Sequence, residues 1–206
     1  MRIITISRQF GSGGRELGKR LSDVLGWDYY DKEIINKLAE DNGLDENYVR
    51  HALSNHEWHT VPLTYSNTFA SATISPNSNT QLLLKQRRVI ESIAEAGNDC
   101  IIVGRDADVI LSDYRPFRVF VCADMDSRVA RCMKHEEKKE SGRLSEKDIR
   151  QNIKRIDKRR IQVRELVTGH TWGDPSFFDL TVNAGGKDLK KLSGMVADFA
   201  LAWFEE

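Results

Sequence analysis

A glycine-rich turn near the start of the chain joins an apolar run to an amphipathic run. Residues 3–7 read Ile-Ile-Thr-Ile-Ser, and three glycines follow within the next seven positions. A strand that passes through such a turn into a helix leaves backbone N–H groups pointing at one place, and the helix N-terminus adds partial positive charge. The pattern predicts a phosphate-binding site made by Gly11, Ser12, Gly13, Gly14, Arg15 and Glu16.

The turn departs from the two common phosphate motifs. The dinucleotide motif GxGxxG needs a third glycine where the chain has Glu16. The motif GxxxxGK[ST] also fails: if Arg15 stands for the lysine, Gly14 fits, but Gln9 occupies the first glycine position and Glu16 the hydroxyl position. A structural turn whose glycines supply positive φ angles explains the same residues, so both interpretations stay open.

Charged residues follow two further predicted strands. Arg105 and Asp106 come directly after the apolar run 100–103, and Asp31 ends the short run 27–30. Ligands bind at the carboxyl ends of strands in parallel α/β sheets, so these three residues are candidates for binding an acceptor molecule. The alternatives are structural: Asp106 would favour the start of the next helix through its charge, and Asp31 would be a helix N-cap.

A basic stretch lies in the second half of the chain. Residues 128–164 contain 14 Lys or Arg and 6 Asp or Glu, although the formal net charge of the whole chain is zero. Arg155 and Arg159 are four residues apart and therefore share a helix face, which suits a lid that closes over phosphates. Most of these charges are expected on a solvated surface. Aromatic residues do not interleave with them, which argues against nucleic-acid binding.

Strand and helix predictions alternate along the chain. Strands are expected at residues 3–7, 27–30, 100–103, 119–122 and 180–182. Helices are expected at residues 13–25, 32–39, 45–57, 81–95, 125–140, 145–167 and 189–204, with a mobile loop at 60–80. This order predicts an α/β fold with a mostly parallel sheet.

Composition narrows the class of protein. The chain has 206 residues, of which 40% are hydrophobic, and this suits one globular domain. It contains no apolar run near the ~20 residues that a membrane span needs, so we expect no membrane partner. Three cysteines without CxxC spacing favour free thiols in a reducing cytoplasm over disulfides, and no metal site is predicted.

Several segments resemble the cytidylate kinases of bacteria, and most closely a subgroup called cytidylate-kinase-like proteins. The resemblance covers most of the chain except residues 45–80. It rests on Ser7 to Glu16 in the turn, Tyr29 to Asp31, Val103 to Asp106, Arg128 and Arg131, Arg155 to Arg159, Trp172 to Asp174, and Phe178 to Leu180. It implies a single domain over residues 1–206 with a three-layer P-loop NTPase-like fold and a central parallel sheet of about five strands. A helical acceptor-binding insertion would span roughly 32–98, and a helical lid roughly 126–175, with errors of ~2–4 residues at each boundary.

The resemblance also implies a reaction. ATP with Mg²⁺ would transfer its γ-phosphoryl group to a small acceptor, with CMP or dCMP as the acceptor that the resemblance implies, by positioning and charge neutralisation. In the ungapped register, Arg8 stands at the first P-loop glycine, Gly14 at the catalytic lysine and Glu16 at the hydroxyl that holds Mg²⁺. The missing charge would come from Arg8 or Arg15. Arg105 would hold the acceptor phosphate, and the lid would supply Arg128, Arg131, Arg155 and Arg159.

Other functions stay open at this stage. Residues 45–80 match the cytidylate kinases poorly, so the acceptor could be another small molecule. The replacement of the lysine by Gly14 also fits a nucleotide sensor that binds without turnover. Nucleic-acid binding is a distant third, and the oligomeric state is open.

Overall fold

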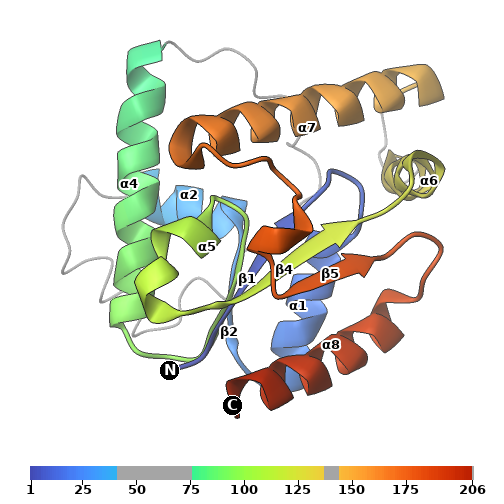
Figure 1. Cartoon of the computed structure of the whole chain (residues 1–206). Helices are drawn as coiled ribbons and strands as arrows, with labels where there is room; N and C mark the ends of the chain where they lie inside the picture. Colours follow the sequence, from blue (N-terminus) through green and yellow to red (C-terminus); the bar gives the residue numbers. More distant parts are fainter. Residues whose placement is uncertain (41–75, 137–143, 206) are drawn as a thin grey trace.

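The computed structural model describes residues 1–40, 76–136 and 144–205. At its centre lies a sheet of five parallel strands in the order β2-β3-β1-β4-β5 (Figure 1). The strands are β1 (Ile3–Arg8), β2 (Asp28–Tyr30), β3 (Cys100–Val103), β4 (Phe117–Cys122) and β5 (Leu180–Asn183). The sheet confirms the predicted α/β class.

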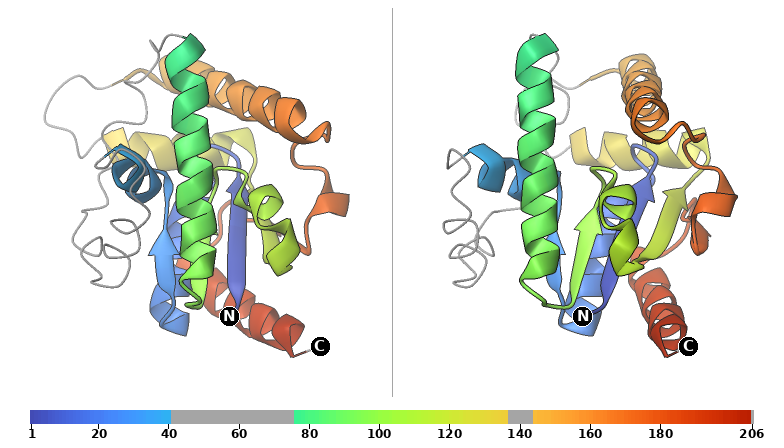
Figure 2. Two further views of the ribbon diagram at one scale, coloured as in Figure 1. Left: turned by 90° about the vertical axis from the view of Figure 1, so that its left-hand side faces the viewer. Right: turned by 60° about the vertical axis from the view of Figure 1, so that its left-hand side comes forward.

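Helices cover both faces of the sheet and one of its ends (Figure 1, Figure 2). One face carries α1 (Gly14–Leu25) and α8 (Leu189–Phe204), and the other carries α4 (Pro76–Glu95) and α5 (Ala107–Ile110). Two helices, α6 (Met125–Glu136) and α7 (Glu146–Thr168), lie across the end at which the strands terminate. The remaining helices are α2 (Lys32–Glu40), which packs on α4, and the short 3₁₀ segments η2 (Ser112–Tyr114) and η3 (Pro175–Phe177).

The apolar runs of the sequence form the core because the inner strands are covered on both faces. Ile4 of β1 pairs with Ile101 of β3 on one side and with Phe117 of β4 on the other. All three side chains are fully buried, as are Leu17 and Leu21 of α1. Strands that are apolar at every position are typical of a parallel sheet between two helical layers. The core therefore fixes the carboxyl ends of β1 and β3, where the predicted site residues begin.

A second, smaller hydrophobic cluster joins the two helices above the sheet. It consists of Val129 and Cys132 of α6 and Ile149 and Ile153 of α7, with Phe10 packed against it. These helices correspond to the segment that the sequence analysis assigned to a lid. Because Phe10 belongs to the glycine-rich turn, the cluster ties both helices to that turn.

Most predicted boundaries agree with the structure, and one differs clearly. α4 begins at Pro76, five residues before the predicted start at 81 and inside the predicted loop 60–80. The predicted helix 45–57 and the rest of that loop lie outside the described residues. Gly26 has a φ of 69° and caps the C-terminus of α1. Over the described residues, the helices are all too short or too polar to cross a membrane.

Candidate functional site

The glycine-rich turn connects β1 to α1 at the switch point of the sheet, between β3 and β4. Gly11 and Gly13 adopt φ angles of 76° and 92°, which side chains other than glycine rarely tolerate. Inside the turn, both the backbone N–H and the hydroxyl of Ser12 donate to the carbonyl oxygen of Gln9. The turn thereby leads into the N-terminus of α1 at Gly14, where the first N–H groups of the helix point outward along its axis. This is the backbone geometry that binds anions.

Two arginines of α6 hold the turn in place. The carbonyl oxygen of Phe10 accepts a hydrogen bond of 2.7 Å from Arg128 Nε. Arg128 is buried and also forms an ion pair with Asp157 of α7. Arg131 donates to the carbonyl oxygens of Gly11, at 2.9 Å, and Ala184, at 3.1 Å. The sequence analysis expected these two arginines to contact phosphate, whereas the structure engages both guanidinium groups with the protein itself.

Asp157 completes this attachment from α7. Its Oδ1 atom accepts a hydrogen bond of 2.8 Å from the backbone N–H of Phe10. Arg160, one turn further along α7, donates to the carbonyl oxygen of Arg8 at 2.8 Å. The turn is therefore held from both helices above the sheet.

The side chain of Arg8 occupies space that two glycines leave open. A Cβ atom on Gly14 would lie 2.6 Å from Cβ of Arg8, which is too close for any real contact. The guanidinium group crosses to the end of β3, where a Cβ atom on Gly104 would lie 1.6 Å from Nη1 of Arg8. Arg8 thus fits only because both positions are glycine, and its charge lies between the ends of β1 and β3.

Four cations from four different elements influence one another at this place. Arg8 ends β1, Lys32 begins α2, Arg105 follows β3 and Arg160 lies on α7. Burial, followed by repulsion from Arg8, lowers the pKa of Arg105 to about 10 and that of Arg160 to about 9. Burial also lowers the pKa of Arg8, although Tyr29 and Asp31 oppose the shift. We call these four residues the cation cluster.

Lys32 belongs to the cluster although the residue as a whole is exposed. Partial burial of its ammonium group and repulsion from Arg105, Arg8 and Arg160 lower its pKa. The arginines remain charged at neutral pH, so repulsion among the four residues is present whenever no anion is bound. Such an arrangement favours the binding of a multiply charged anion.

Arg15, the other candidate for the missing lysine, is neutralised by acids. Its Nε atom donates to Asp31 at 2.6 Å and its Nη2 atom donates to Glu33 at 2.8 Å. These hydrogen bonds and charges outweigh desolvation and raise its pKa. Asp31 also accepts from the backbone N–H groups of Glu33 and Ile34, so it caps α2 as the structural alternative predicted. Of the two arginines, Arg8 therefore has the weaker compensation.

The turn after β3 is strained. Gly104, Arg105 and Asp106 all have positive φ angles, of 81°, 62° and 51°. For residues other than glycine this conformation costs of order 1–3 kcal/mol each and persists only where the surroundings enforce it. Arg164 of α7 supplies that enforcement, since it donates to Asp108 at 2.9 and 2.7 Å and to Asp106 at 3.4 Å. Burial raises the pKa of Asp106 above its usual value, although the nearby Arg164 opposes the shift.

A sequence model of the cytidylate kinase-like family matches residues 3–185. The chain belongs to the cytidylate kinase-like family. No curated protein sequence matches it. An uncharacterized protein from Eubacterium ventriosum has a similar structure, with a TM-score of 0.71, 24% identity, and coverage of 97% of this chain and 98% of that one.

Two shikimate kinases share the fold of this cytidylate kinase-like protein. The enzyme from Acinetobacter baumannii, solved in complex with shikimate, has a TM-score of 0.51 and 10% identity over 98% of this chain and 94% of that one. The enzyme from Bacteroides thetaiotaomicron has a TM-score of 0.53 and 12% identity over 96% and 97%. The fold is therefore that of the P-loop kinases, and family membership supports a kinase-like, nucleotide-binding protein.

On α7 the structure separates two sets of arginines. The predicted lid residues Arg155 and Arg159 are both exposed, and Arg155 donates to Asn152 of its own helix. They do not join the cation cluster. Arg160 and Arg164 face the sheet instead. One face of the helix runs through Ile149, Ile153, Asp157, Arg160 and Arg164, at spacings of three and four residues, and all of these except the half-buried Arg160 are buried. Extending the apolar stripe past Ile153 would have found Arg160 in the sequence.

Acidic residues of the described chain do not form a ready-made Mg²⁺ site. Glu16, which the resemblance to cytidylate kinases places at the position of the metal-binding hydroxyl, accepts a hydrogen bond of 2.9 Å from Arg20. Within the described ranges there is no group of three or more His, Cys, Asp or Glu residues that could hold a metal ion. Since Mg²⁺ in such sites is bound largely by phosphates and water, the described residues fit only an ion that arrives with its nucleotide.

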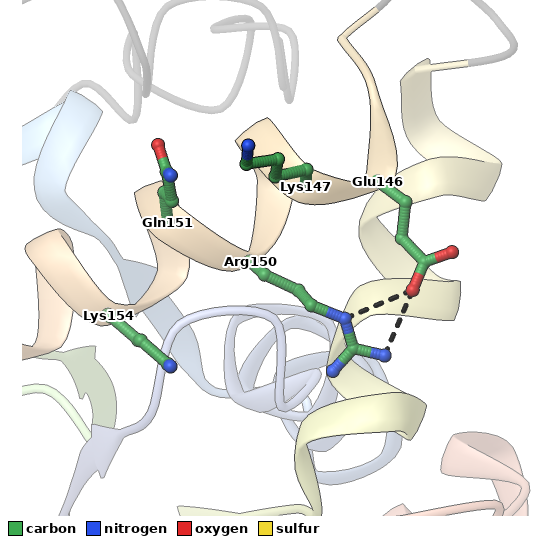
Figure 3. Close-up of a pocket in the computed structure, with 5 residues that line it drawn as sticks. All are labelled: Glu146, Lys147, Arg150, Gln151 and Lys154. Atoms are coloured by element: carbon green, nitrogen blue, oxygen red, sulfur yellow. Dashed lines mark hydrogen bonds and ion pairs between the residues drawn. The ribbon is translucent and has the colours of Figure 1, made fainter.

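A shallow hollow on α7 shares no lining residue with the cation cluster. It is lined by Glu146, Lys147, Arg150, Gln151 and Lys154. Figure 3 shows Arg150 turned toward Glu146, and Arg150 also pairs with Asp126 at 2.6 Å. All five lining residues come from one helix, so the hollow lacks the convergence of elements that marks the cation cluster.

Proposed function

We propose that this protein transfers the γ-phosphoryl group of ATP to a small acceptor, with CMP and dCMP as the first acceptors to test. The observation that carries the proposal is the cation cluster beside the glycine-rich turn. Transfer between two phosphate-bearing molecules brings several negative charges together, and catalysis depends mainly on positioning and neutralising them. Four convergent cations next to an anion-binding turn meet that requirement.

Arg8 is proposed to replace the lysine of the P-loop. Relative to the cytidylate kinases, the cation and the glycine have exchanged places: position 8 changes from glycine to arginine, and position 14 from lysine to glycine. The 2.6 Å separation of their Cβ positions gives this exchange a steric reason, because a side chain at position 14 would collide with Arg8. Arginine can also bind two phosphate oxygens at once.

The other residues receive roles from their positions. Backbone N–H groups from Gly11 to Gly14 bind the donor phosphates, and Arg105 holds the acceptor phosphate. Arg160 enters from α7 and stabilises the charge that develops during transfer. Mg²⁺ would neutralise donor phosphates when it is bound with ATP. No covalent intermediate on the protein is required.

The proposal is tested by incubating the protein with ATP, Mg²⁺ and a panel of nucleoside monophosphates, and measuring ADP and product. We expect diphosphate from CMP or dCMP. Replacing Arg8 by Gln should lower kcat/KM by about 10²–10³-fold, as the loss of one transition-state donor does elsewhere. The exposed Arg87, which pairs with Glu91 of its own helix, provides the control variant Arg87→Gln. Equal turnover in Arg8→Gln and wild type would refute the role of Arg8.

Nucleotide binding without turnover is the second candidate function. It is favoured by the pairing of Glu16 with Arg20, which leaves a carboxylate, already engaged, where kinases place a metal-binding hydroxyl. Binding of ATP with no ADP formed, across the monophosphates and across small hydroxylated acceptors, would support this function over phosphoryl transfer.

A further inference from the structure

Beside the cation cluster, three polar side chains from three elements meet at one oxygen atom. Oδ1 of Asn36, on α2, accepts a hydrogen bond of 2.9 Å from Nε2 of Gln86 on α4. The same oxygen accepts a hydrogen bond of 2.8 Å from Nη2 of Arg105, which follows β3. We call these three residues the amide subsite.

Arg105 fixes the orientation of both amides. A guanidinium group only donates hydrogen bonds, so the atom of Asn36 that faces it must be the carbonyl oxygen. That oxygen can then interact with Gln86 only through the Nε2 group of Gln86. The carbonyl oxygen of Gln86 is consequently turned away from Asn36, and an amide flip cannot relieve this arrangement.

Two buried atoms of the subsite lack partners. Oε1 of Gln86 and Nε of Arg105 are buried, and neither has a hydrogen-bond partner among the described residues. Gln86 as a whole is only 2% exposed. A buried polar atom without a partner costs about 1–3 kcal/mol, so such atoms call for a specific explanation. Gln86 Oε1 is an acceptor and Arg105 Nε is a donor. Both atoms belong to side chains that donate a hydrogen bond to Asn36 Oδ1.

The subsite is continuous with the cation cluster. Arg105 belongs to both, and Lys32 of the cluster lies four residues before Asn36, on the same face of α2. Four residues of helix separate these positions by about 6 Å along the axis. A small molecule whose phosphate is bound by the cluster can therefore place a neighbouring neutral group at the subsite.

We infer that the amide subsite selects the acceptor by binding a neutral group that donates to Gln86 Oε1 and accepts from Arg105 Nε. This inference rests on the proposed function, because it takes the cluster to bind the acceptor phosphate. The required pairing of one donor with one acceptor is met by a sugar hydroxyl and by the amino-pyrimidine edge of a base. The doubly ionised phosphate group of an organic phosphate only accepts hydrogen bonds, so it cannot donate to Gln86 Oε1.

The test compares affinities for three probes: inorganic phosphate, ribose 5-phosphate and CMP. Wild type should bind at least one of the two organic phosphates more than tenfold tighter than inorganic phosphate. Gln86→Met, which keeps the length of the side chain but removes its polar atoms, should abolish that advantage and leave the affinity for inorganic phosphate within twofold. An advantage for ribose 5-phosphate assigns the hydroxyl, and one for CMP alone assigns the base.

A stability measurement separates recognition from a merely structural role. Gln86→Met removes a buried acceptor without a partner together with the hydrogen bond from Nε2 to Asn36 Oδ1, and that oxygen keeps its bond from Arg105. The two losses oppose each other, so the melting temperature of the ligand-free protein should stay the same or rise. A structural role predicts a fall in melting temperature with no change in selectivity, and that result would overturn the inference. Equal affinity of wild type for all three probes would also overturn it, while leaving phosphate binding by the cluster intact. Failure of every probe to bind would instead count against the proposed function.

Discussion

Nη1 of Arg8 lies 1.6 Å from the point that a Cβ atom on Gly104 would occupy. The guanidinium group therefore rests directly on the backbone at the end of β3, and no other residue type at position 104 leaves room for it. Gly104→Ala should displace the Arg8 guanidinium, because the end of a flexible side chain can move away from the new methyl group. We expect phosphoryl transfer to fall about as far as in Arg8→Gln.

A matched variant separates this displacement from backbone strain. Gly97 has a φ of 79°, close to the 81° of Gly104, but a Cβ atom there would meet nothing within 4 Å. Both alanine variants should lose about 1–2 kcal/mol of stability from the left-handed backbone. Only Gly104→Ala should also lose activity and phosphate binding. Similar activities in the two variants would show that the position of Arg8 does not matter.

Gly14→Ala tests the steric exclusion between positions 8 and 14. The new methyl group would lie 2.6 Å from Cβ and 3.0 Å from Cγ of Arg8, inside a helix terminus that cannot move freely. We expect a loss of roughly 1–3 kcal/mol in unfolding free energy, as overpacking usually causes. The double variant Arg8→Gly/Gly14→Ala should recover most of this loss. In contrast, Gly194→Ala in α8, where a Cβ atom meets nothing within 4 Å, should be neutral or stabilising by denaturant titration.

Asp157→Asn should destabilise the protein strongly. Asp157 is buried, pairs with the buried Arg128 and binds the backbone N–H of Phe10, so its charge compensates a cation that water cannot reach. Removing one partner of a buried pair costs about 3–5 kcal/mol. Asp126→Asn is the control, because Asp126 pairs with Arg150 but has 83% of its side chain exposed. A surface pair of this kind is worth about 0–1 kcal/mol. Equal losses in both variants would contradict the anchoring role of Asp157.

Lys32→Gln should weaken anion binding without lowering the stability of the ligand-free protein. Removing one cation relieves repulsion with Arg8, Arg105 and Arg160, so the ligand-free protein should melt at the same temperature or higher. Its stabilisation by inorganic phosphate should shrink, whereas wild type gains about 2.7 kcal/mol when phosphate is at one hundred times its dissociation constant. Lys19→Gln, which removes a cation paired with Asp23 on the same helix, should leave the phosphate response unchanged. Differential scanning fluorimetry with and without phosphate distinguishes these outcomes.

Cys100 should make stability depend on pH in the alkaline range. Burial, with the nearby charges of Asp28 and Asp99, raises the pKa of its thiol from 9.0 to about 12. Between pH 9 and 12 the unfolded chain has lost this proton and the folded chain still holds it, so the contribution to stability falls as pH rises. The unfolding free energy of wild type minus that of Cys100→Ala should be constant below pH 8. Above pH 9 it should decrease by up to about 1.4 kcal/mol per pH unit. A flat difference would contradict the raised pKa.

The sequence predicted the sheet well because β3 is apolar at every position and β1 and β4 are largely apolar. Runs such as 100–103 have few alternatives when turns and amphipathic helices surround them. It also predicted that Arg105 and Asp106 would lie at the carboxyl end of a strand. It did not predict that Arg8 would cross to Gly104, because that contact joins residues 96 positions apart and depends on the order of the strands.

The predictions for α7 show where pattern analysis stops. Charged residues are usually exposed, so the sequence analysis chose Arg155 and Arg159 by their shared face and passed over Arg160. The structure turns the stripe from Ile149 to Arg164 toward the sheet and continues it from isoleucines into charged residues, because Asp157 pairs with Arg160 and Asp108 with Arg164. The partner of Arg164 lies 56 positions away in the sequence, and a helix pattern does not reveal such a partner.

The exchange between positions 8 and 14 has a consequence for how such chains descend from one another. A lysine at position 14 would collide with Arg8, and on the role that we propose for Arg8, its loss alone leaves the turn without its cation. One arrangement has arginine at position 8 and glycine at 14, and the other has glycine at 8 and lysine at 14. No single substitution converts one into the other while keeping a cation at the turn and avoiding the collision. A lineage that passed from one to the other had to change both residues together or cross an impaired intermediate, and a search that demands lysine at one fixed position would discard chains of this type.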